Sequence, residues 1–538
     1  GNDDNGIPYR YQSLEDYIGQ SGVDWQDETF NPTWSQDHNL SITGGDEKTT
    51  YSLLFTRYNE NGIFNNSGFD RTTAKFRLKQ KLTKKISFDA TINYAQTNRK
   101  GIGTTADSGR FNMLAQILSA RPTGGLKLTD EELLASAIDP VMLEDGSSLA
   151  QVNPVKQTES VTNKKRAEMW SANVSLTWEI IKGLTFRTAA TYNTTNNRID
   201  KFYKEGSKEA FRNGQKPYGD TQMGRDLRWT NSNQLTWKQK INKKNSYDIM
   251  LGHEISYRSN EYLLGQAMDF PVDYLGNNNL GLGATPSKVV TDFGDKKLLS
   301  FFARGNYNYD NRYLLTATVR ADGSTVFSKK NKWGFFPSFS AGYDIARTPY
   351  FQQLALPVSQ LKVRVSYGRL GNQNGAGLYD YIAQMPLDAQ GTNAWLLPGI
   401  SSSTASKGTI AKTPKMISPY ITWEKVDNAN LGFDLMLLKN RLSITADFYQ
   451  RTTRDMIGPA ESIPSISGIA SDDRAKVNNA TLRNRGWELS VSWNDKLKCG
   501  FSYGIGFNVF NYKAVVTKYN NPEGIIYNNH TGLAANKG

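Results

Sequence analysis

The sequence predicts an all-β protein, a large antiparallel transmembrane β-barrel with long extracellular loops, of which this chain covers about sixteen strands. Three observations carry the prediction. Extended segments of roughly ten to twelve residues alternate polar with apolar side chains, and short connections alternate with long ones along the chain. The composition is also rich in aromatic residues but contains no long apolar run. Such a chain is typical of a sheet with one apolar and one polar face.

The composition fits strands that cross a membrane and excludes helices that do. Hydrophobic residues make up only 38% of the 538 residues, whereas aromatic residues reach 12%, with 27 Tyr and 11 Trp. A barrel strand exposes every second residue to lipid, so a low apolar fraction is expected, and its aromatic residues gather where the apolar band meets water. No run approaches the roughly eighteen apolar residues of a membrane helix.

Charge and cysteine content exclude several other classes of protein. The net charge is +13, but the basic residues are dispersed, as where Lys75 and Arg77 alternate with Ala74 and Phe76. This pattern favours a solvated lumen or a rim that faces lipid headgroups, and no nucleic acid is expected as a partner. The single cysteine, Cys499, excludes an intrachain disulfide and a thiolate metal cluster.

Taken in order, the chain divides into three parts. Residues 1–38 form an irregular lead-in, residues 39–511 hold the barrel strands and loops, and residues 512–538 begin a further, incomplete loop. Short turns are expected at 44–48, 83–85, 182–183, 242–245, 310–311, 439–441 and 494–498. Long connections are expected at 59–70, 99–166, 196–226, 259–295, 321–332, 372–420 and 453–482.

This alternation of short and long connections predicts an up-and-down barrel, with tight turns in the periplasm and long loops outside the cell. The connector 347–360 is the one long connection where a short one is due. A soluble β-sandwich also alternates polar and apolar residues, but its strands are shorter and its turns follow one another without this rhythm.

The segment 169–180 tests the membrane interpretation. Trp170, Val174 and Trp178 share one face, and Ser171 and Asn173 share the other. In a tilted strand the two tryptophans would lie roughly 20 Å apart along the barrel axis, close to the height of an apolar band. The residues expected to form the aromatic belts at the membrane surfaces are Trp170, Trp178, Tyr192 and Tyr257.

The segment 228–241 does not fit this pattern. Asn231 and Asn233 share a face with Trp229 and Trp237, so that polar residues fall within the predicted apolar band. The sequence alone offers no physical account of them.

Three segments between Arg312 and Gln373 carry the most specific pattern. They read R-A-D-G-S at 320–324, W-G-F-F-P-S-F-S-A-G-Y at 333–343 and L-K-V-R-V-S-Y-G-R-L-G-N-Q at 361–373. They resemble the barrel signature of the SusC/RagA-like TonB-dependent outer-membrane transporters of Bacteroidetes-type bacteria. Further segments are similar to other hairpins of that family in the same order, at 38–64, 423–457 and 479–493.

The resemblance implies more than the residues themselves do. It implies a barrel of about 22 strands in the intact protein, plugged by an N-terminal domain and placed in the bacterial outer membrane as a multi-pass protein. It also implies energisation by TonB, a SusD-like surface lipoprotein as a lid, and contact with outer-membrane lipid and lipopolysaccharide. Residues 1–38 would then follow a plug that is absent from this sequence, and the intact protein is expected to be considerably longer.

Motifs that suggest catalysis lack their context. G-I-G-T-T-A at 101–106 follows an amphipathic strand, whereas a dinucleotide-binding strand would be continuously apolar. D-S-G at 107–109 lacks a positioned base, because the chain has only three histidines. T-D-E-E at 129–132 matches a helix capping box. We therefore expect no enzyme, no catalytic or metal site and no cofactor, although Asp472 and Asp473 leave calcium binding by a loop open.

The sequence thus predicts import of a bulky nutrient, a glycan or a peptide. Tyr379, Tyr381 and Trp395 are the candidate loop aromatics for contact with that cargo, since exposed rings stack on sugars and apolar groups, although rings in loops more often serve loop packing. The alternative is a surface adhesin or glycan-binding β protein that transports nothing. Extraction only by detergent and one continuous apolar belt would favour the transporter. A soluble glycoside hydrolase would need two carboxylates facing one cleft, which the sequence cannot place.

Overall fold

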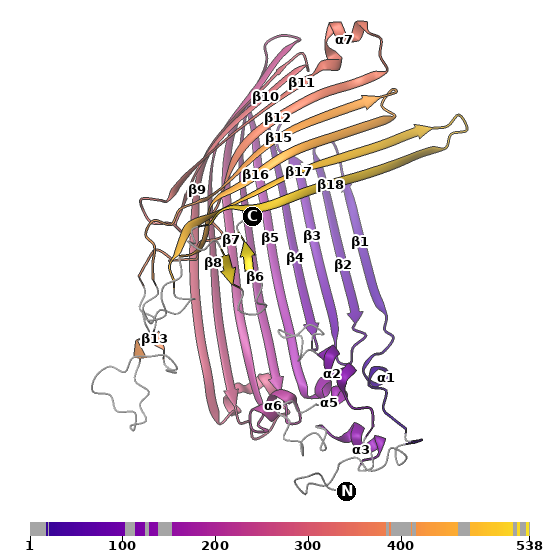
Figure 1. Ribbon diagram of the computed structural model, residues 1–538, viewed down its shortest axis with the longest axis vertical. Helices are drawn as coiled ribbons and strands as arrows, with labels where there is room; N and C mark the ends of the chain where they lie inside the picture. Colours follow the sequence, from indigo (N-terminus) through magenta and orange to yellow (C-terminus); the bar gives the residue numbers. More distant parts are fainter. Residues whose placement is uncertain are drawn as a thin grey trace.

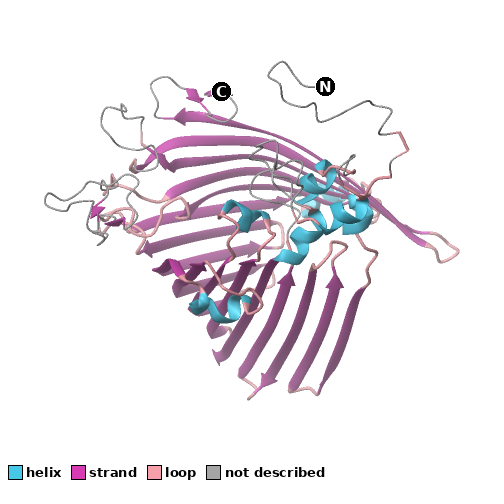
Figure 2. Cartoon of the chain, turned by 90° about the horizontal axis from the view of Figure 1, so that it is seen from below, coloured by secondary structure: helices cyan, strands magenta, loops and turns pink. Residues whose placement is uncertain are grey.

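A computed structural model describes residues 18–19, 21–102, 113–123, 128–137, 153–383, 387–388, 410–411, 416–460, 474–519, 525–527 and 534–536. Within these residues sixteen strands pair in chain order into one antiparallel sheet, with neighbours in sequence as neighbours in space. The sheet is long and strongly curved (Figures 1 and 2). Its edges in the described residues are β1 and β18. The predicted all-β antiparallel architecture is confirmed.

The strands are longer than those of ordinary soluble sheets. Their bounds are β1 Ser35–Gly45, β2 Thr49–Asn61, β3 Gly68–Lys81, β4 Ile86–Lys100, β5 Val161–Ile181, β6 Leu184–Tyr203, β7 Tyr218–Lys240, β8 Asn245–Met268, β9 Thr285–Tyr309, β10 Tyr313–Ser324, β11 Trp333–Asp344, β12 Val358–Asn372, β15 Glu424–Leu437, β16 Leu442–Pro459, β17 Lys476–Lys496 and β18 Ser502–Tyr519. Two short pairs, β13 Leu387–Asp388 with β14 Ile410–Ala411 and β19 Ile525–Tyr527 with β20 Ala534–Asn536, stand apart from the sheet.

In the described residues the helices are short and lie outside the sheet, α1 before β1 and the others in the connections between strands. Their bounds are α1 Trp25–Thr29, α2 Met113–Ser119, α3 Asp130–Ala135, α5 Pro154–Ser160, α6 Lys208–Arg212, α7 Pro349–Gln353, and the 3-10 turns η3 Gly276–Leu282 and η4 Ile345–Arg347. Helix α3 begins with the predicted capping box, since Thr129 accepts from the backbone of Glu132 and the Glu132 side chain accepts in return. No helix in the described part of the chain is long and apolar enough to cross a membrane.

The predicted rhythm of connections is confirmed. All seven expected short turns join neighbouring strands at one end of the sheet, and the long connector between β11 and β12 holds η4 and α7 at that same end (Figure 1). In the turn between β5 and β6, Gly183 has a φ of +86°, and a Cβ there would lie 2.4 Å from the carbonyl oxygen of Lys238. Glycine is therefore required at this turn.

The strands extend farther toward the long loops than the sequence predicts. The connections expected at 196–226 and 259–295 span only 204–217 and 269–284, because β7, β8 and β9 have 23, 24 and 25 residues. Here both faces carry polar side chains, as with the consecutive residues Arg225 and Asp226 on β7, so the apolar alternation that marks a strand is lost. The backbone ladder does not need that alternation and continues. The strands also extend past the expected barrel range of 39–511. The first strand, β1, begins at Ser35, and β18 continues to Tyr519, where a loop is expected.

Candidate functional site

One face of the sheet is apolar along a band that crosses every strand. The register places Phe76 opposite Ile92, Ile92 opposite Ala172, and Ala172 opposite Tyr192. Residues directly opposite in neighbouring strands share a face, so these rows continue across the whole sheet. At its far side, Leu431 lies opposite Phe448 and Phe448 opposite Trp487. We call this continuous surface the apolar belt.

Aromatic side chains gather at both borders of the apolar belt. Toward the long loops, the rings of Tyr94 and Trp170 lie 4.6 Å apart and those of Trp229 and Tyr257 lie 6.1 Å apart. Toward the short turns, Trp237 meets Tyr247 at 5.8 Å, Tyr309 meets Tyr313 at 6.0 Å, and Tyr313 stacks on Tyr343 at 4.8 Å. Two aromatic rows around an apolar band are the pattern of membrane-spanning barrels.

The predicted belt aromatics all lie on this face. Trp170, Trp178 and Tyr192 are 47%, 43% and 41% exposed, and Tyr257 is half-buried beneath Lys297, whose ammonium lies 5.8 Å from its ring centre. Val174, midway between the two tryptophans, is also exposed. Their contact with lipid remains a prediction, consistent with this placement.

The two asparagines that did not fit the pattern form a small polar cluster within the belt. Asn233 Nδ2 donates to Asn231 Oδ1 at 2.6 Å and lies 3.4 Å from His253 Nδ1, and Asn231 Nδ2 donates to the carbonyl oxygen of Ala189 at 3.3 Å. Polar groups in contact with hydrocarbon are stabilised by such internal partners. The hydrogen bonds thus account for polar residues at these positions.

The opposite face is polar and carries ion pairs. Arg364 donates to both carboxylate oxygens of Asp434 at 2.8 and 3.0 Å and to Asp447 at 3.3 Å. In membrane-spanning barrels the polar face of the sheet lines the interior. Because these side chains are partly exposed, each pair contributes little to stability, and its main effect is to fix charge along the wall.

A second network on the same face centres on Arg320. Its guanidinium reaches Asp322 at 2.8 Å, Ser300 Oγ at 2.9 Å and Glu254 at 3.4 Å. Ser300 is fully buried. The polar face therefore carries charges that are paired both within one strand and between strands, on a surface that water can reach.

At the long-loop end a hydrophobic core holds the connections in place. We call it the loop core, and it consists of the buried residues Val326, Phe327, Phe336, Ile421 and Trp423. Trp423 Nε1 donates to the carbonyl oxygen of Lys332 at 3.0 Å, which ties the β12–β15 connection to the β10–β11 loop. The buried carboxylate of Glu424 accepts from Asn372 Nδ2 at 2.5 Å and from the backbone N–H of Ile457 at 2.8 Å.

Two of the three candidate cargo residues take part in this loop packing. The Tyr379 hydroxyl donates to Asp295 at 3.1 Å, which raises the pKa of Tyr379 above its ordinary value. The Tyr381 hydroxyl donates to the carbonyl oxygen of Thr325 at 3.3 Å, and its ring packs on the loop core. Trp395 lies outside the described residues, as do Asp472 and Asp473. Contact of these aromatics with cargo stays a prediction.

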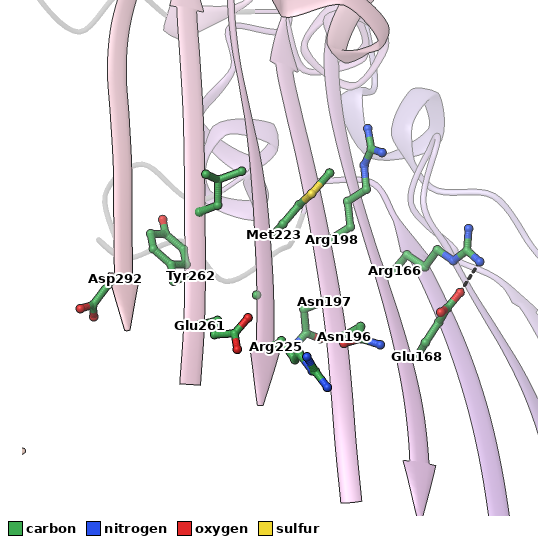
Figure 3. A pocket seen from close by; sticks show the side chains of 12 residues that line it. Arg166, Glu168, Asn196, Asn197, Arg198, Met223, Arg225, Glu261, Tyr262 and Asp292 are labelled. Carbon is green, nitrogen blue, oxygen red and sulfur yellow. Dashed lines mark hydrogen bonds and ion pairs between the residues drawn. The ribbon is translucent and has the colours of Figure 1, made fainter. Parts of the chain in front are cut away.

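A recess of about 600 Å³ lies on the belt side of the sheet, beyond the belt toward the long loops. It spans β5 to β9 and is lined by both basic and acidic side chains, among them Arg166, Glu168, Arg198, Arg225 and Glu261 (Figure 3). Arg166 forms an ion pair with Glu168 (Figure 3), and Arg198 pairs with Asp200 at 2.9 Å. Positive and negative charges are therefore balanced here.

The described residues present no group of three or more His, Cys, Asp and Glu side chains that could hold a metal ion. Cys499 is exposed and free. The glycine-rich segment 101–106 and the D-S-G segment 107–109 fall largely or wholly outside the described residues, so the structure adds nothing to their interpretation.

A sheet of long antiparallel strands, apolar on one face between two aromatic rows and charged on the other, defines an outer-membrane β-barrel. The family described as "TonB dependent receptor-like, beta-barrel" matches residues 135–535. The chain belongs to this family.

Curated proteins with similar sequences are also TonB-dependent receptors. The TonB-dependent receptor SusC of Bacteroides thetaiotaomicron is 25% identical over 514 residues, which cover 91% of this chain and 48% of SusC. The TonB-dependent receptor P3 of Formosa agariphila is 25% identical over 527 residues, 95% of this chain and 48% of the receptor. The chain thus spans about half the length of these curated relatives. Among solved structures, the RagAB peptide transporter superposes with a TM-score of 0.80 at 21% identity, covering 98% of this chain and 57% of that one, which shows a shared fold.

Proposed function

We propose that this chain forms the barrel wall of a TonB-dependent importer that carries a bulky nutrient, a glycan or a peptide, across the outer membrane. In the proposal a SusD-like surface lipoprotein closes over the long loops, and TonB supplies the energy from the periplasm. No bond of the cargo is made or broken, so the protein is not an enzyme.

The single observation that carries the proposal is the division of the sheet into two faces. The apolar belt is continuous from β1 to β18, as a wall embedded in lipid requires, and the other face is lined by paired charges that a hydrated passage can accommodate. A surface adhesin that does not enter the membrane has no need of a continuous belt between two aromatic rows. The relatives support the same interpretation, since one of them is SusC and the RagAB peptide transporter shares the fold.

The mechanism is passage along the polar face. Cargo would bind between the loop core at the long-loop end and the lid, and would then move past ion pairs such as those of Arg364 and Arg320. Because each guanidinium is already paired, the wall offers exchangeable hydrogen bonds rather than one deep electrostatic trap. A bulky polar cargo can therefore slide along it without being held.

The test is to purify the full-length protein from its native membrane in detergent and identify what accompanies it by mass spectrometry. We expect a surface lipoprotein in about equal amount, together with an oligosaccharide or a peptide mixture. Deletion of the gene should abolish uptake of the identified compound. Extraction without detergent, or unchanged uptake after deletion, would overturn the proposal and favour an adhesin.

A further inference from the structure

A strongly basic surface lies on the belt side of β12 and β15–β18, beyond the apolar belt toward the long loops. The outermost belt row there runs through Val365, Leu431, Phe448 and Trp487. The cationic side chains on this face beyond that row include Arg369, Lys425, Arg454, Arg483, Arg485 and Lys513, and we call these six the basic grid.

The register places the basic grid close to the belt. Arg485 and Lys513 lie one step beyond the Phe448–Trp487 row, and Arg369 and Arg483 lie two steps beyond it. Residues on one face of a strand repeat about every 7 Å, so these cations lie roughly 7–14 Å past the apolar border along the strand. This is the level at which the headgroups of the outer leaflet begin.

The grid carries a large excess of positive charge. Asp427 pairs with Arg369 and Arg454, and Asp455 pairs with Lys425 at 2.9 Å. Arg483, Arg485 and Lys513 form no ion pair within the part of the chain that the structure describes. The surface therefore lacks the anions that would balance it.

Hydrogen bonds hold the guanidinium groups of Arg369, Arg454 and Arg485 in place. Asp427 is 6% exposed and accepts from Arg369 at 2.7 and 3.2 Å and from Arg454 at 2.8 Å. Arg485 Nε donates to Gln450 Oε1 at 2.6 Å. Each arginine keeps further N–H groups for a ligand, and a positioned guanidinium matches the oxygens of a phosphate in a fork.

The excess charge is not a general property of this rim. At the corresponding level beyond Trp170 and Tyr192, Arg166 and Arg198 each pair with a carboxylate, and on β2 Arg57 pairs with Asp70 at 3.3 Å. The basic grid therefore differs from its surroundings in charge and not in its height above the belt.

We propose that the basic grid binds the phosphate groups of a phosphorylated glycolipid of the outer leaflet. Charge complementarity favours a phosphate as the ligand. The adjoining belt favours a lipid over a free anion, because Val365, Phe448 and Trp487 next to the grid are 45%, 52% and 38% exposed and would contact the acyl chains of the lipid. The proposal concerns the membrane side of the wall and is independent of the cargo.

The test uses the full-length protein in phosphatidylcholine nanodiscs and counts bound glycolipid by native mass spectrometry. The probes are lipid A that carries both phosphates and the same lipid A with its phosphates removed. In the Arg483→Gln/Arg485→Gln variant we expect affinity for phosphorylated lipid A to fall about a hundredfold, or about tenfold for each lost charged hydrogen bond. The matched control, Arg166→Gln/Arg198→Gln, removes two arginines at the same level and should change affinity by less than about threefold.

Several outcomes would overturn the assignment. Equal binding of the dephosphorylated lipid would exclude phosphate recognition, and an equal loss in the control would make the effect one of general charge. Displacement of the lipid by millimolar inorganic phosphate would point to a free-anion site. A change in barrel self-association with unchanged lipid binding would identify a contact between copies. Resistance of the unheated barrel to SDS confirms folding of each variant, and lipoprotein and cargo recovery in the same preparations report separately on import.

Discussion

At the scale of single residues, the most informative positions are those where polarity and location conflict. Asn231 and Asn233 lie on the apolar belt, and the sequence offers no reason for them because their further partners, the Ala189 carbonyl oxygen and His253 respectively, are on other strands. The register of β7 with β8 places Asn233 directly opposite His253 and Asn231 opposite Ile255. A hydrogen-bonded cluster across a strand pair is therefore visible only once the register is known.

We expect Asn231 and Asn233 to be energetically coupled. A double-mutant cycle with Asn231→Ala and Asn233→Ala should give an interaction of about 1 kcal/mol in the free energy of unfolding in bilayers, the scale of hydrogen bonds within membranes. The control cycle pairs Asn231→Ala with Asn98→Ala on β4, which is too distant to interact. If both cycles are additive, the 2.6 Å hydrogen bond does not stabilise the barrel.

The basic grid, like the asparagine cluster, becomes visible only once the strand register is known. Arg369, Arg454 and Arg483 are scattered in the sequence and individually resemble any polar strand residue, and the sequence predicted only a headgroup-facing rim in general terms. Their assembly on one surface follows from the pairings of β12, β15, β16 and β17. Correct turn positions, which the sequence does provide, are the signal from which those pairings could be built.

At the scale of elements, the long connections are held by packing against the strand ends. Phe336 on β11 is 5% exposed, and its ring meets Trp423 at 5.4 Å. The neighbouring strand β12 comes so close that a Cβ on Gly371 would lie 2.1 Å from Phe336 Cζ. The absence of a side chain at Gly371 is thus what lets the ring enter the loop core.

Gly371→Ala should therefore loosen the loop core. We expect it to lower the free energy of unfolding by about 1–3 kcal/mol, because the ring of Phe336 must move out of its packed position. Thermal unfolding measures the loss, and faster limited proteolysis within residues 325–332 locates it. Gly305→Ala on β9, where a Cβ meets nothing within 4 Å, is the matched control. Similar behaviour of the two variants would contradict this account of the core.

The sequence predicts elements better where their environment is asymmetric. Between the aromatic rows, apolar alternation marks each strand and its turns, and the predicted positions hold. Beyond the belt, both faces of β7 to β9 meet water, so Arg225 and Glu261 give no periodic signal, and the predicted strands stop short of the observed ends. Backbone pairing alone determines those ends, and single-residue patterns do not report it.

At the scale of the whole molecule, the two faces of the sheet define the orientation of the barrel wall. Val174 and Ser175 are neighbours in sequence, yet Val174 lies midway between the two aromatic rows on the belt and Ser175 lies opposite Asp89 on the polar face. They form a matched pair for testing which side meets lipid.

Val174→Arg should destabilise the barrel in bilayers by about 2–4 kcal/mol, the cost of placing arginine at the membrane midplane of a barrel. Ser175→Arg should have little effect, since its guanidinium enters water and can pair with Asp89. Chemical unfolding of the full-length protein in liposomes measures both. Equal destabilisation, or a greater loss for Ser175→Arg, would show that the belt does not contact acyl chains.

The strands differ in length around the sheet, with 23 to 25 residues in β7, β8 and β9 but only 12 in β10 and β11. A strand needs about ten residues to cross the bilayer, so the mouth of the proposed passage has a high rim along β7, β8 and β9 and a low rim along β10 and β11. A lid with a flat lower surface would leave a gap above the low rim. The proposed lid must therefore have a stepped lower surface that complements this rim.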